Sequence, residues 1–298
     1  MDGAFSEQEL TIIRQAFARQ MLCLAGITDD PNLREAFSAV RRERFLGPPP
    51  WKIVLPSVGY VDLVDADAAV VYQDVLFGLS PERGVNNGSP SLHARWMHAA
   101  NIKPGERVVH IGAGSGYYTA ILAHLVGEHG RVTAVEYDPK LAEAARRNLS
   151  DLRNVTVVRG DGADWPAEPA DCIYVNYCVG RPALPWLDQL SRAGRLIFPL
   201  GVSAHGGADG GQRARFGAAL LVSAEPGNSQ FRVKWLGPAF FVCAEDPSAR
   251  QTGEHETLTA AFERGGIEFV KSLRWKQSPS PDRSWFMGSG WSLSFDEP

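Results

Sequence analysis

Short apolar runs and amphipathic runs alternate in a regular order through the middle of the chain. The apolar runs predict buried strands at residues 107–111, 132–136, 155–159, 171–175 and 195–199. The runs between them predict helices at residues 117–126, 140–149 and 185–190. Short apolar strands that alternate with helices are typical of a parallel sheet covered on both faces. We therefore expect an α/β fold.

The segments on either side of this region have less regular patterns. Ser6 with Glu9 forms a capping box for a first helix, and Asp30 before Pro31 predicts the start of a second helix. Between them and the sheet, the pattern predicts short strands at 53–55 and 69–72 and a turn at 80–84. Beyond the sheet, it predicts a helix near 256–264 and strands at 218–223, 231–243, 268–275 and 285–295.

Composition and charge exclude several classes of protein. The 298 residues include 44% hydrophobic and 21% charged positions, as in ordinary globular proteins, and the formal net charge of −4 provides no basic field for nucleic acid. The chain lacks an apolar run of about 18 residues, which a membrane span needs, and its first residues lack the pattern of a signal peptide. Four widely spaced cysteines predict neither a zinc site nor a disulfide framework. We expect a cytoplasmic protein with no metal and no nucleic-acid or membrane partner, and we make no prediction of its oligomeric state.

A glycine-rich turn follows the first predicted strand of the sheet and opens a helix. Its glycines are Gly112, Gly114 and Gly116. Glycine allows a tight turn and a close approach of the backbone to a ligand, and the free N–H groups of a helix start favour an anion. Two acids follow at strand ends: Glu136, 24 residues after Gly112, and Asp161, which precedes Gly162. Each alone is compatible with a solvated strand-end acid, but together they predict a nucleoside site.

The spacing distinguishes between two nucleoside cofactors. In the dinucleotide fingerprint a glycine stands three residues after the second glycine, whereas here that position is Tyr117, which would obstruct a pyrophosphate. A methionine carboxylate needs less room. We therefore predict S-adenosyl-L-methionine in preference to NAD, with Glu136 on the ribose hydroxyls and Asp161 and Gly162 beside the adenine amino group.

At this point the sequence resembles the protein-L-isoaspartate O-methyltransferase family. The matching stretches include AFSAVRRERFL, VYQD, PSLHARWM, IGAGSGYYTAILAHL, VTVVRGDG and GRLIFPLG, and they extend from about residue 30 to residue 205. The resemblance implies a class I S-adenosylmethionine-dependent methyltransferase fold with a Rossmann-like sheet, and a carboxylate as methyl acceptor.

The resemblance also suggests three regions. We predict an N-terminal helical and substrate-entry region at residues 1–88, a methyltransferase core that binds S-adenosyl-L-methionine at 89–245, and a small α+β C-terminal extension at 246–298. The extension should fold onto the core, because it is too apolar to stay disordered. Its apolar side chains include Phe262, Ile267, Phe269, Trp285 and Trp291.

Two positions depart from the family pattern. The family's glycine-loop strand ends in an acid, where this chain has His110. The family also has a serine next to the transferring methyl, where this chain has Gly88, preceded by an insertion at residues 80–87. A site that has lost a hydrogen-bonding group discriminates differently among substrates. These departures favour a carboxylate of a specialised peptide or a small acid as the acceptor, oriented by Ser89 and Asn87.

Two other functions stay open. One is genuine isoaspartyl repair, with Ser89 in place of the family serine. The other is a catalytically inactive regulatory protein that binds the cofactor. A carboxylate acceptor is already a nucleophile at neutral pH, so the lack of a recognisable triad of catalytic residues does not exclude an enzyme.

Several candidate residues have a structural alternative. Ser89 before Pro90 is equally a helix N-cap, and Asn87 suits a turn as well as a substrate contact. His110 is either a neutral imidazole that bonds the cofactor's amino group or a packed strand-end histidine. Tyr117 either closes over the methionine arm or packs in the core, and His93 either faces the pocket or caps a turn.

Overall fold

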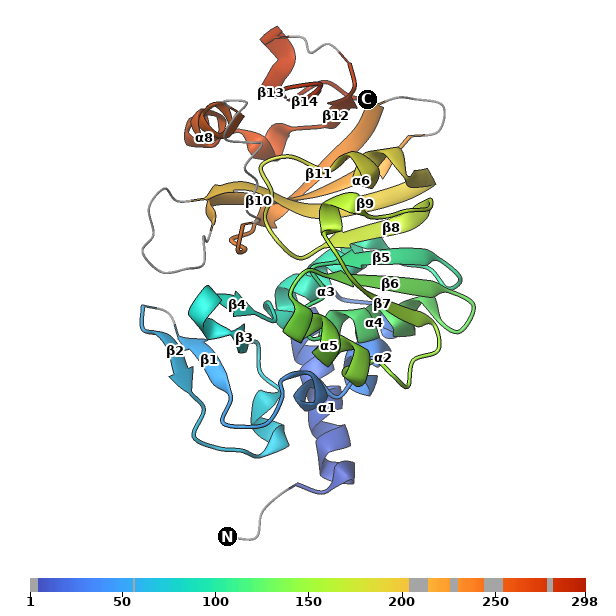
Figure 1. Ribbon diagram of the computed structural model, residues 1–298, viewed down its shortest axis with the longest axis vertical. Coiled ribbons are helices and arrows are strands. Elements are labelled where there is room, and N and C mark those ends of the chain that lie inside the picture. Colours follow the sequence, from blue (N-terminus) through green and yellow to red (C-terminus); the bar gives the residue numbers. More distant parts are fainter. Residues whose placement is uncertain (1–4, 56, 204–213, 226–229, 244–253, 278–280) are drawn as a thin grey trace. The chain divides into compact units, whose positions relative to one another are not determined.

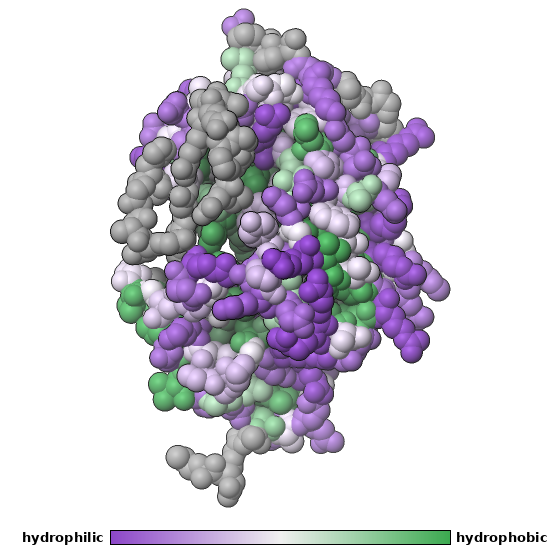
Figure 2. All heavy atoms as spheres, in the orientation of Figure 1, coloured by the Kyte–Doolittle hydropathy of each residue, from purple (hydrophilic) through white to green (hydrophobic). Residues whose placement is uncertain are grey.

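The computed structural model describes residues 5–55, 57–203, 214–225, 230–243, 254–277 and 281–298 (Figure 1). The chain divides into two compact units, one formed by residues 1–107 and 113–160 and the other by residues 108–112 and 161–298. Hydrophilic residues predominate on the face drawn in Figure 2, with apolar residues in small groups between them. None of the helices in the described ranges is long and apolar enough to cross a membrane.

The first unit is mainly helical. Its helices are α1 (Glu7–Leu24), α2 (Pro31–Ala39), α3 (Pro90–Ala100), α4 (Tyr117–Val126) and α5 (Pro139–Asn148). Its strands are β6 (Arg131–Glu136) and β7 (Val155–Arg159), which pair in parallel, and two hairpins, β1 (Lys52–Leu55) with β2 (Gly59–Asp62) and β3 (Gly78–Ser80) with β4 (Val85–Asn86). The capping box at Ser6 and Glu9 and the N-cap at Asp30 form as predicted.

One predicted strand of this unit is wrong. Residues 69–72 read as an apolar β-like run, but Ala68–Val71 is a 3-10 helix. The Asp67 side chain caps it by accepting a hydrogen bond from the N–H of Ala69 at 2.7 Å. This local side-chain cap outweighs the β preference of the short apolar run.

A buried arginine organises the chain that follows this 3-10 helix. Arg42 is fully buried, and its guanidinium donates to the backbone carbonyls of Val71 at 2.8 Å and Val75 at 2.7 Å and also to that of Gln73. The guanidinium carbon lies 4.9 Å from the ring centroid of Phe77. Burial lowers the pKa of Arg42. The arginine therefore fixes the loop 71–75, which carries Asp74.

The second unit is built on a mixed sheet. Its strands are β5 (Arg107–Ile111), β8 (Ala170–Val175), β9 (Leu190–Ser203), β10 (Ala214–Ala224), β11 (Gln230–Pro238), β12 (Ser272–Trp275), β13 (Ser284–Gly288) and β14 (Trp291–Ser294). Strand β8 pairs in parallel with β5 and β9, whereas the pairs from β9 through β10, β11, β12 and β14 to β13 are all antiparallel. The helices are α6 (Leu184–Asp188) and α8 (Glu254–Arg264).

The predicted parallel sheet is thus only part of the arrangement. Parallel neighbours need a crossover of about a dozen residues or more, usually helical, whereas antiparallel neighbours can be joined by short connections. The chain has a helix between β8 and β9 but only short connections from β9 to β10 and from β10 to β11, so the sheet continues as antiparallel strands.

The described part of the C-terminal segment continues the same sheet. Strand β12 pairs with β11, and residues 285–295 form a β13–β14 hairpin instead of one strand, because Gly290 turns the chain at φ +76°. The segment predicted as a strand from 268 begins only at Ser272, after a 3-10 helix. Trp285 and Trp291 are buried, whereas Phe269 is 66% exposed. The region boundaries at 88/89 and 245/246 stay a prediction.

Candidate active site

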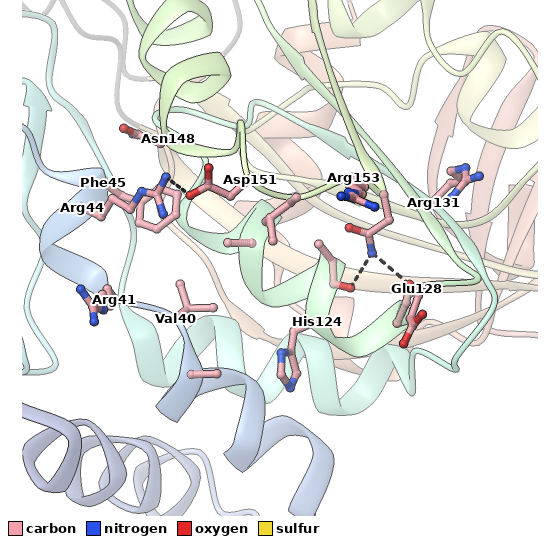
Figure 3. Close-up of a pocket in the computed structure, with 16 residues that line it drawn as sticks. Val40, Arg41, Arg44, Phe45, His124, Glu128, Arg131, Asn148, Asp151 and Arg153 are labelled. Atoms are coloured by element: carbon pink, nitrogen blue, oxygen red, sulfur yellow. Dashed lines mark hydrogen bonds and ion pairs between the residues drawn. The ribbon is translucent and has the colours of Figure 1, made fainter. Parts of the chain in front are cut away.

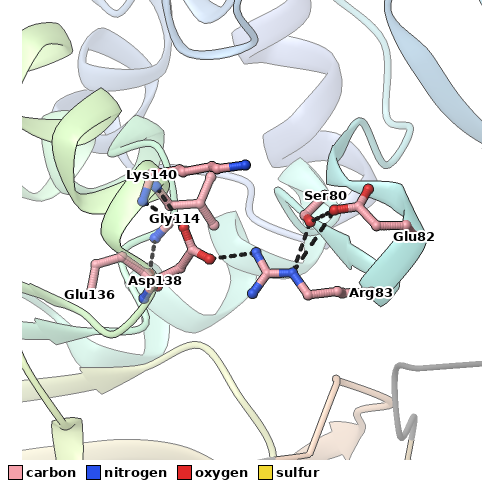
Figure 4. A network of polar contacts seen from close by, with 8 residues as sticks. Ser80, Glu82, Arg83, Gly114, Glu136, Asp138 and Lys140 are labelled. Atoms are coloured by element: carbon pink, nitrogen blue, oxygen red, sulfur yellow. Dashed lines mark hydrogen bonds and ion pairs between the residues drawn. The ribbon is translucent and has the colours of Figure 1, made fainter.

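The first unit contains two of the predicted cofactor motifs, the start of α4 and Glu136. The carboxylate of Glu136, at the end of β6, accepts hydrogen bonds from the N–H of Gly114 at 2.7 Å and from the N–H of Asp138 at 2.9 Å (Figure 4). Glu136 is buried, and this burial raises its pKa although the two N–H donors oppose the shift. The acid therefore fixes the glycine turn, and each carboxylate oxygen keeps a further lone pair for a hydroxyl.

The glycine turn requires glycine at its last position. Gly116 has φ +99°, and a Cβ there would lie 2.7 Å from a side-chain carbon of Leu149. The carbonyl of the preceding residue, Ser115, accepts a hydrogen bond from the side chain of Asn148 at 2.9 Å. The turn is thus held from two sides, by Glu136 and by the end of α5.

A neighbouring ion pair was not predicted. Arg83 contacts Asp138 at 2.6 Å and donates to the Ser80 hydroxyl at 2.9 Å (Figure 4). Asp138 also caps α5 by accepting from the N–H groups of Lys140 and Leu141. The pair connects the insertion at residues 80–87 to the chain just after Glu136. The Asp138-Pro139 sequence signals only the helix cap, and nothing in the sequence indicates its arginine partner.

The second unit contains other residues that the sequence predicted to bind the cofactor. His110, at the end of β5, is fully buried, and burial lowers its pKa to about 3. Its Nε2 lies 2.8 Å from the side-chain nitrogen of Asn176, which donates to it, so the ring is neutral. The Oδ1 of Asn176 is buried without a hydrogen-bond partner in the described part of the chain.

The Gly160–Gly162 stretch is shaped by close packing. A Cβ at Gly162 would lie 2.1 Å from Ile111, so only glycine fits, and the carbonyl of Gly162 accepts from the indole of Trp186 at 2.9 Å. Asp161 is exposed and accepts from the N–H of Ala163 at 2.9 Å. The chain passes between the two units at Arg107–Val108, Gly112–Ala113 and Gly160–Asp161.

The predicted acceptor loop, residues 86–89, belongs to the first unit. Ser89 is the N-cap of α3, and its hydroxyl donates to Asp74 at 2.9 Å. Asn87 is buried, and its side-chain oxygen accepts from the N–H of Phe77 at 2.8 Å. The Nδ2 donor of Asn87 is buried without a hydrogen-bond partner in the described residues. Asp74, which holds both Ser89 and Ser91, was not predicted as part of this loop.

The space beside Gly88 is occupied by an imidazole ring. Gly88 has φ +75°, and a Cβ there would lie 2.4 Å from Nε2 of His93. The His93 ring is buried and stacks on Tyr118 with a centroid distance of 3.7 Å, and the Tyr118 hydroxyl donates to the carbonyl of Gly88. The imidazole therefore fills the position where a side chain of residue 88 would begin.

Comparison with known proteins identifies the family. The family model for protein-L-isoaspartate(D-aspartate) O-methyltransferase matches residues 19–210, more than half of the chain. The chain belongs to this family. Protein-L-isoaspartate O-methyltransferase of Thermotoga maritima is 36% identical over 179 residues, which cover 59% of this chain and 51% of that protein. The Aeropyrum pernix protein of the same name is 33% identical over 187 residues, which cover 61% of this chain and 65% of that protein.

Solved structures support the fold. A protein-L-isoaspartate O-methyltransferase structure matches 84% of this chain and 69% of its own, with a TM-score of 0.63 and 26% identity. A Plasmodium falciparum protein described as a beta-aspartate methyltransferase, solved with S-adenosyl-L-homocysteine, matches 77% of this chain and 97% of its own, with a TM-score of 0.56 and 19% identity. The predicted class I methyltransferase fold is confirmed. The chain spans about half the length of the Thermotoga maritima relative.

In the structure, the predicted site residues fall into three groups. Gly114, Gly116 and Glu136 come together around one turn of the first unit. Gly112, His110, Asp161 and Gly162 belong to the second unit, and Asn87 and Ser89 to the acceptor loop. Tyr117 is 2% exposed, and its ring lies against Phe45 in the core with its hydroxyl unpartnered among the described residues. The roles assigned to these residues in binding and catalysis stay predictions.

Restoring a serine at position 88 is expected to destabilise the protein. In Gly88→Ser, a left-handed φ costs about 1–2 kcal/mol and the collision with His93 about 1–3 kcal/mol more. Urea unfolding should show this loss, and His93→Ala in the same background should recover the part due to the collision. If the effects of Gly88→Ser and His93→Ala on the free energy of unfolding are additive, the two side chains do not compete for one space.

Proposed function

We propose that this chain is an S-adenosyl-L-methionine-dependent carboxyl O-methyltransferase whose acceptor is the isoaspartyl carboxylate of a peptide. The observation that carries the proposal is the family match over residues 19–210, which includes the glycine turn, Glu136 and the acceptor loop. This favours isoaspartyl peptides over the specialised peptide or small acid that the glycine at position 88 suggested.

The residues of the cofactor motifs fit this cofactor in shape and charge. Gly114 and Gly116 give the turn its left-handed backbone, with φ of +58° and +99°, and Glu136 has lone pairs for both ribose hydroxyls. His110 is neutral, because a pKa of about 3 leaves it unprotonated at neutral pH, so it does not repel a sulfonium cation. When bound, S-adenosyl-L-methionine supplies an electrophilic methyl group.

The protein then has to align the acceptor with this methyl group. A carboxylate is a competent nucleophile at neutral pH, so in-line displacement needs correct placement and exclusion of water more than a general base. Asn87 can contribute to placement because its Oδ1 is fixed by the N–H of Phe77 while its buried Nδ2 lacks an acceptor among the described residues. An acceptor carboxylate would provide the missing partner.

Asn87→Asp tests this role. Aspartate keeps an oxygen for the N–H of Phe77 but replaces the donor by a charge that repels a carboxylate. Since a hydrogen bond to a charged group contributes about 1.5–3 kcal/mol, kcat/KM for an isoaspartyl peptide should fall about tenfold or more, with the Kd for S-adenosyl-L-homocysteine unchanged.

Asn86→Asp is the matched control for this variant. The Oδ1 of Asn86 also accepts a backbone N–H, from Gly88 at 2.9 Å, and its Nδ2 already has acceptors in Tyr60 and Gly84. It should therefore change kcat/KM much less. If kcat/KM falls equally in the two variants, or if Asn87→Asp loses cofactor affinity, Asn87 does not position the acceptor.

A second candidate acceptor is a small carboxylic acid. The specific observation in its favour is the imidazole of His93 beside Gly88, because it changes the wall next to the position of the family serine. If this candidate is correct, small acids are methylated and isoaspartyl peptides are not, so both substrates belong in the same assay.

A further inference from the structure

The first unit contains a pocket that the proposed function does not use. Its volume is about 700 Å³, and it lies between the end of α2, the chain at residues 41–45, the middle of α4 and the connection from α5 to β7 (Figure 3). Pockets of about 300–1,000 Å³ are the usual size for small organic ligands. Gly114, Gly116 and Glu136 are not among its lining residues.

Positive charge predominates around this pocket. Four arginines line it against two carboxylates, and the residues concerned are Arg41, Arg44, Arg131, Arg153, Glu128 and Asp151. Arg44 pairs with Asp151 at 2.6 Å and Arg41 pairs at 2.9 Å with a residue outside the pocket, Glu7. In Figure 3 these two arginines lie at one end of the pocket, and Arg131 and Arg153 lie at the other.

The second pair of arginines is available for an anion. Within the described residues, Arg153 has no carboxylate partner, and the guanidinium of Arg131 donates to the carbonyl of Gly130. Arg131 is the first residue of β6 and Arg153 lies two residues before β7, and the N–H of Val132 donates to the carbonyl of Asn154 at 2.9 Å, so the two segments are neighbours. Guanidinium groups are the donors that proteins most often use to bind phosphate, and both of these groups line the same pocket.

The floor of the pocket is apolar. It includes Phe45, Leu152, Ala120 and Ala123, of which Phe45 is 4% exposed. A ligand that fits this pocket therefore has a phosphate group for Arg131 and Arg153 and a flat or apolar body for the floor. An inorganic anion alone would leave most of this volume unfilled.

Two contacts connect the pocket to the glycine turn. Asn148 lines the pocket, and its Nδ2 donates to the carbonyl of Ser115, between Gly114 and Gly116, at 2.9 Å. Phe45 also lines it, and its ring lies 5.7 Å from that of Tyr117, the first residue of α4. A ligand that moved either side chain would act directly on the turn.

We propose that this pocket is a second ligand site, for a phosphorylated small molecule with an apolar or aromatic body, and that its occupancy changes the affinity of the glycine turn for the cofactor. The binding part of this inference is independent of the proposed function. The coupling part rests on the glycine turn as the cofactor site.

Binding is tested with the full chain by calorimetry, using uridine 5′-monophosphate, phenyl phosphate, inorganic phosphate and uridine. The two phosphate esters should bind, inorganic phosphate should bind more weakly, and uridine should not bind. Replacing both Arg131 and Arg153 by Gln should weaken ester binding at least about tenfold. The matched control replaces Arg146 and Arg147, exposed on α5 and paired with Glu143, and should leave ester binding unchanged.

Three results would overturn the site: no binding of either ester, equal binding of inorganic phosphate and the esters, or equal losses in the two double variants.

For the coupling, the Kd for S-adenosyl-L-homocysteine should change about fivefold or more when uridine 5′-monophosphate is saturating. Asn148→Ala, which removes the hydrogen bond to the carbonyl of Ser115, should reduce this change. Ester binding with no change in the cofactor Kd would overturn the coupling alone, and methyl transfer is not needed for either readout.

Discussion

Glu136→Ala should weaken binding of S-adenosyl-L-methionine about ten- to a hundredfold, because a charge-assisted hydrogen bond contributes about 1.5–3 kcal/mol. The loss has two sources, since Glu136 is proposed to accept from the ribose hydroxyls and also holds the N–H of Gly114 at 2.7 Å. Calorimetric titration with S-adenosyl-L-homocysteine measures it. Glu143→Gln, which removes an exposed acid from α5, should leave the affinity unchanged.

Glu136 should also make the affinity for the cofactor depend on pH. Burial raises the pKa of Glu136 above 4.5, so the carboxyl takes up a proton at a higher pH than an exposed glutamate does. Protonation removes acceptor capacity, so cofactor affinity should fall as the pH decreases from neutral through that raised pKa, and Glu136→Gln should lack this fall. Unchanged affinity in Glu136→Ala at neutral pH would contradict the assignment.

Arg42→Met should lower the free energy of unfolding by about 3–5 kcal/mol. The substitution leaves three backbone carbonyls without a donor, at Val71, Gln73 and Val75, and an unsatisfied buried polar group costs about 1–3 kcal/mol. It also removes the cation–π contact with Phe77. Arg42→Lys should recover little, because an ammonium cannot reproduce the planar fork that reaches three carbonyls.

Urea unfolding of Arg41→Met provides the control for Arg42. Arg41 is exposed and pairs with the exposed Glu7, so its removal should change the free energy of unfolding by less than about 1 kcal/mol. A similarly small effect of Arg42→Met would show that the loop 71–75 does not depend on this guanidinium.

The sequence predicted best where a local signal sets the structure. The bounds of β5 and α4 agree with the prediction because an apolar run ends at a glycine turn and a second apolar run begins after it. The 3-10 helix at Ala68–Val71 was missed because a side-chain cap from Asp67 overrides a weak apolar pattern. The strands at 107–111, 132–136, 155–159, 171–175 and 195–199 pair in parallel as predicted, but the pairing of the later strands was not predicted, because periodicity reports which residues are buried and not which strands are neighbours.

In the candidate site, too, the features with a local sequence signal were predicted and the others were not. The glycine turn and Glu136 were predictable, since both have positional signals at strand ends. The partners of Arg42 are backbone carbonyls 29 to 33 residues away, which leave no mark in the sequence. The contact of His93 with Gly88 was also missed, because it depends on how α3 directs one side chain and not on spacing.

Methyl transfer to a defined pair of peptides tests the central claim most directly. The full chain is incubated with methyl-labelled S-adenosyl-L-methionine and an isoaspartyl peptide, with the same peptide containing ordinary aspartate and a panel of small carboxylic acids as controls. The account predicts label in the isoaspartyl peptide that is released by mild base, as a methyl ester should be, and little label in the aspartyl peptide. Equal labelling of both peptides, or base-labile label in the small acids alone, would contradict it.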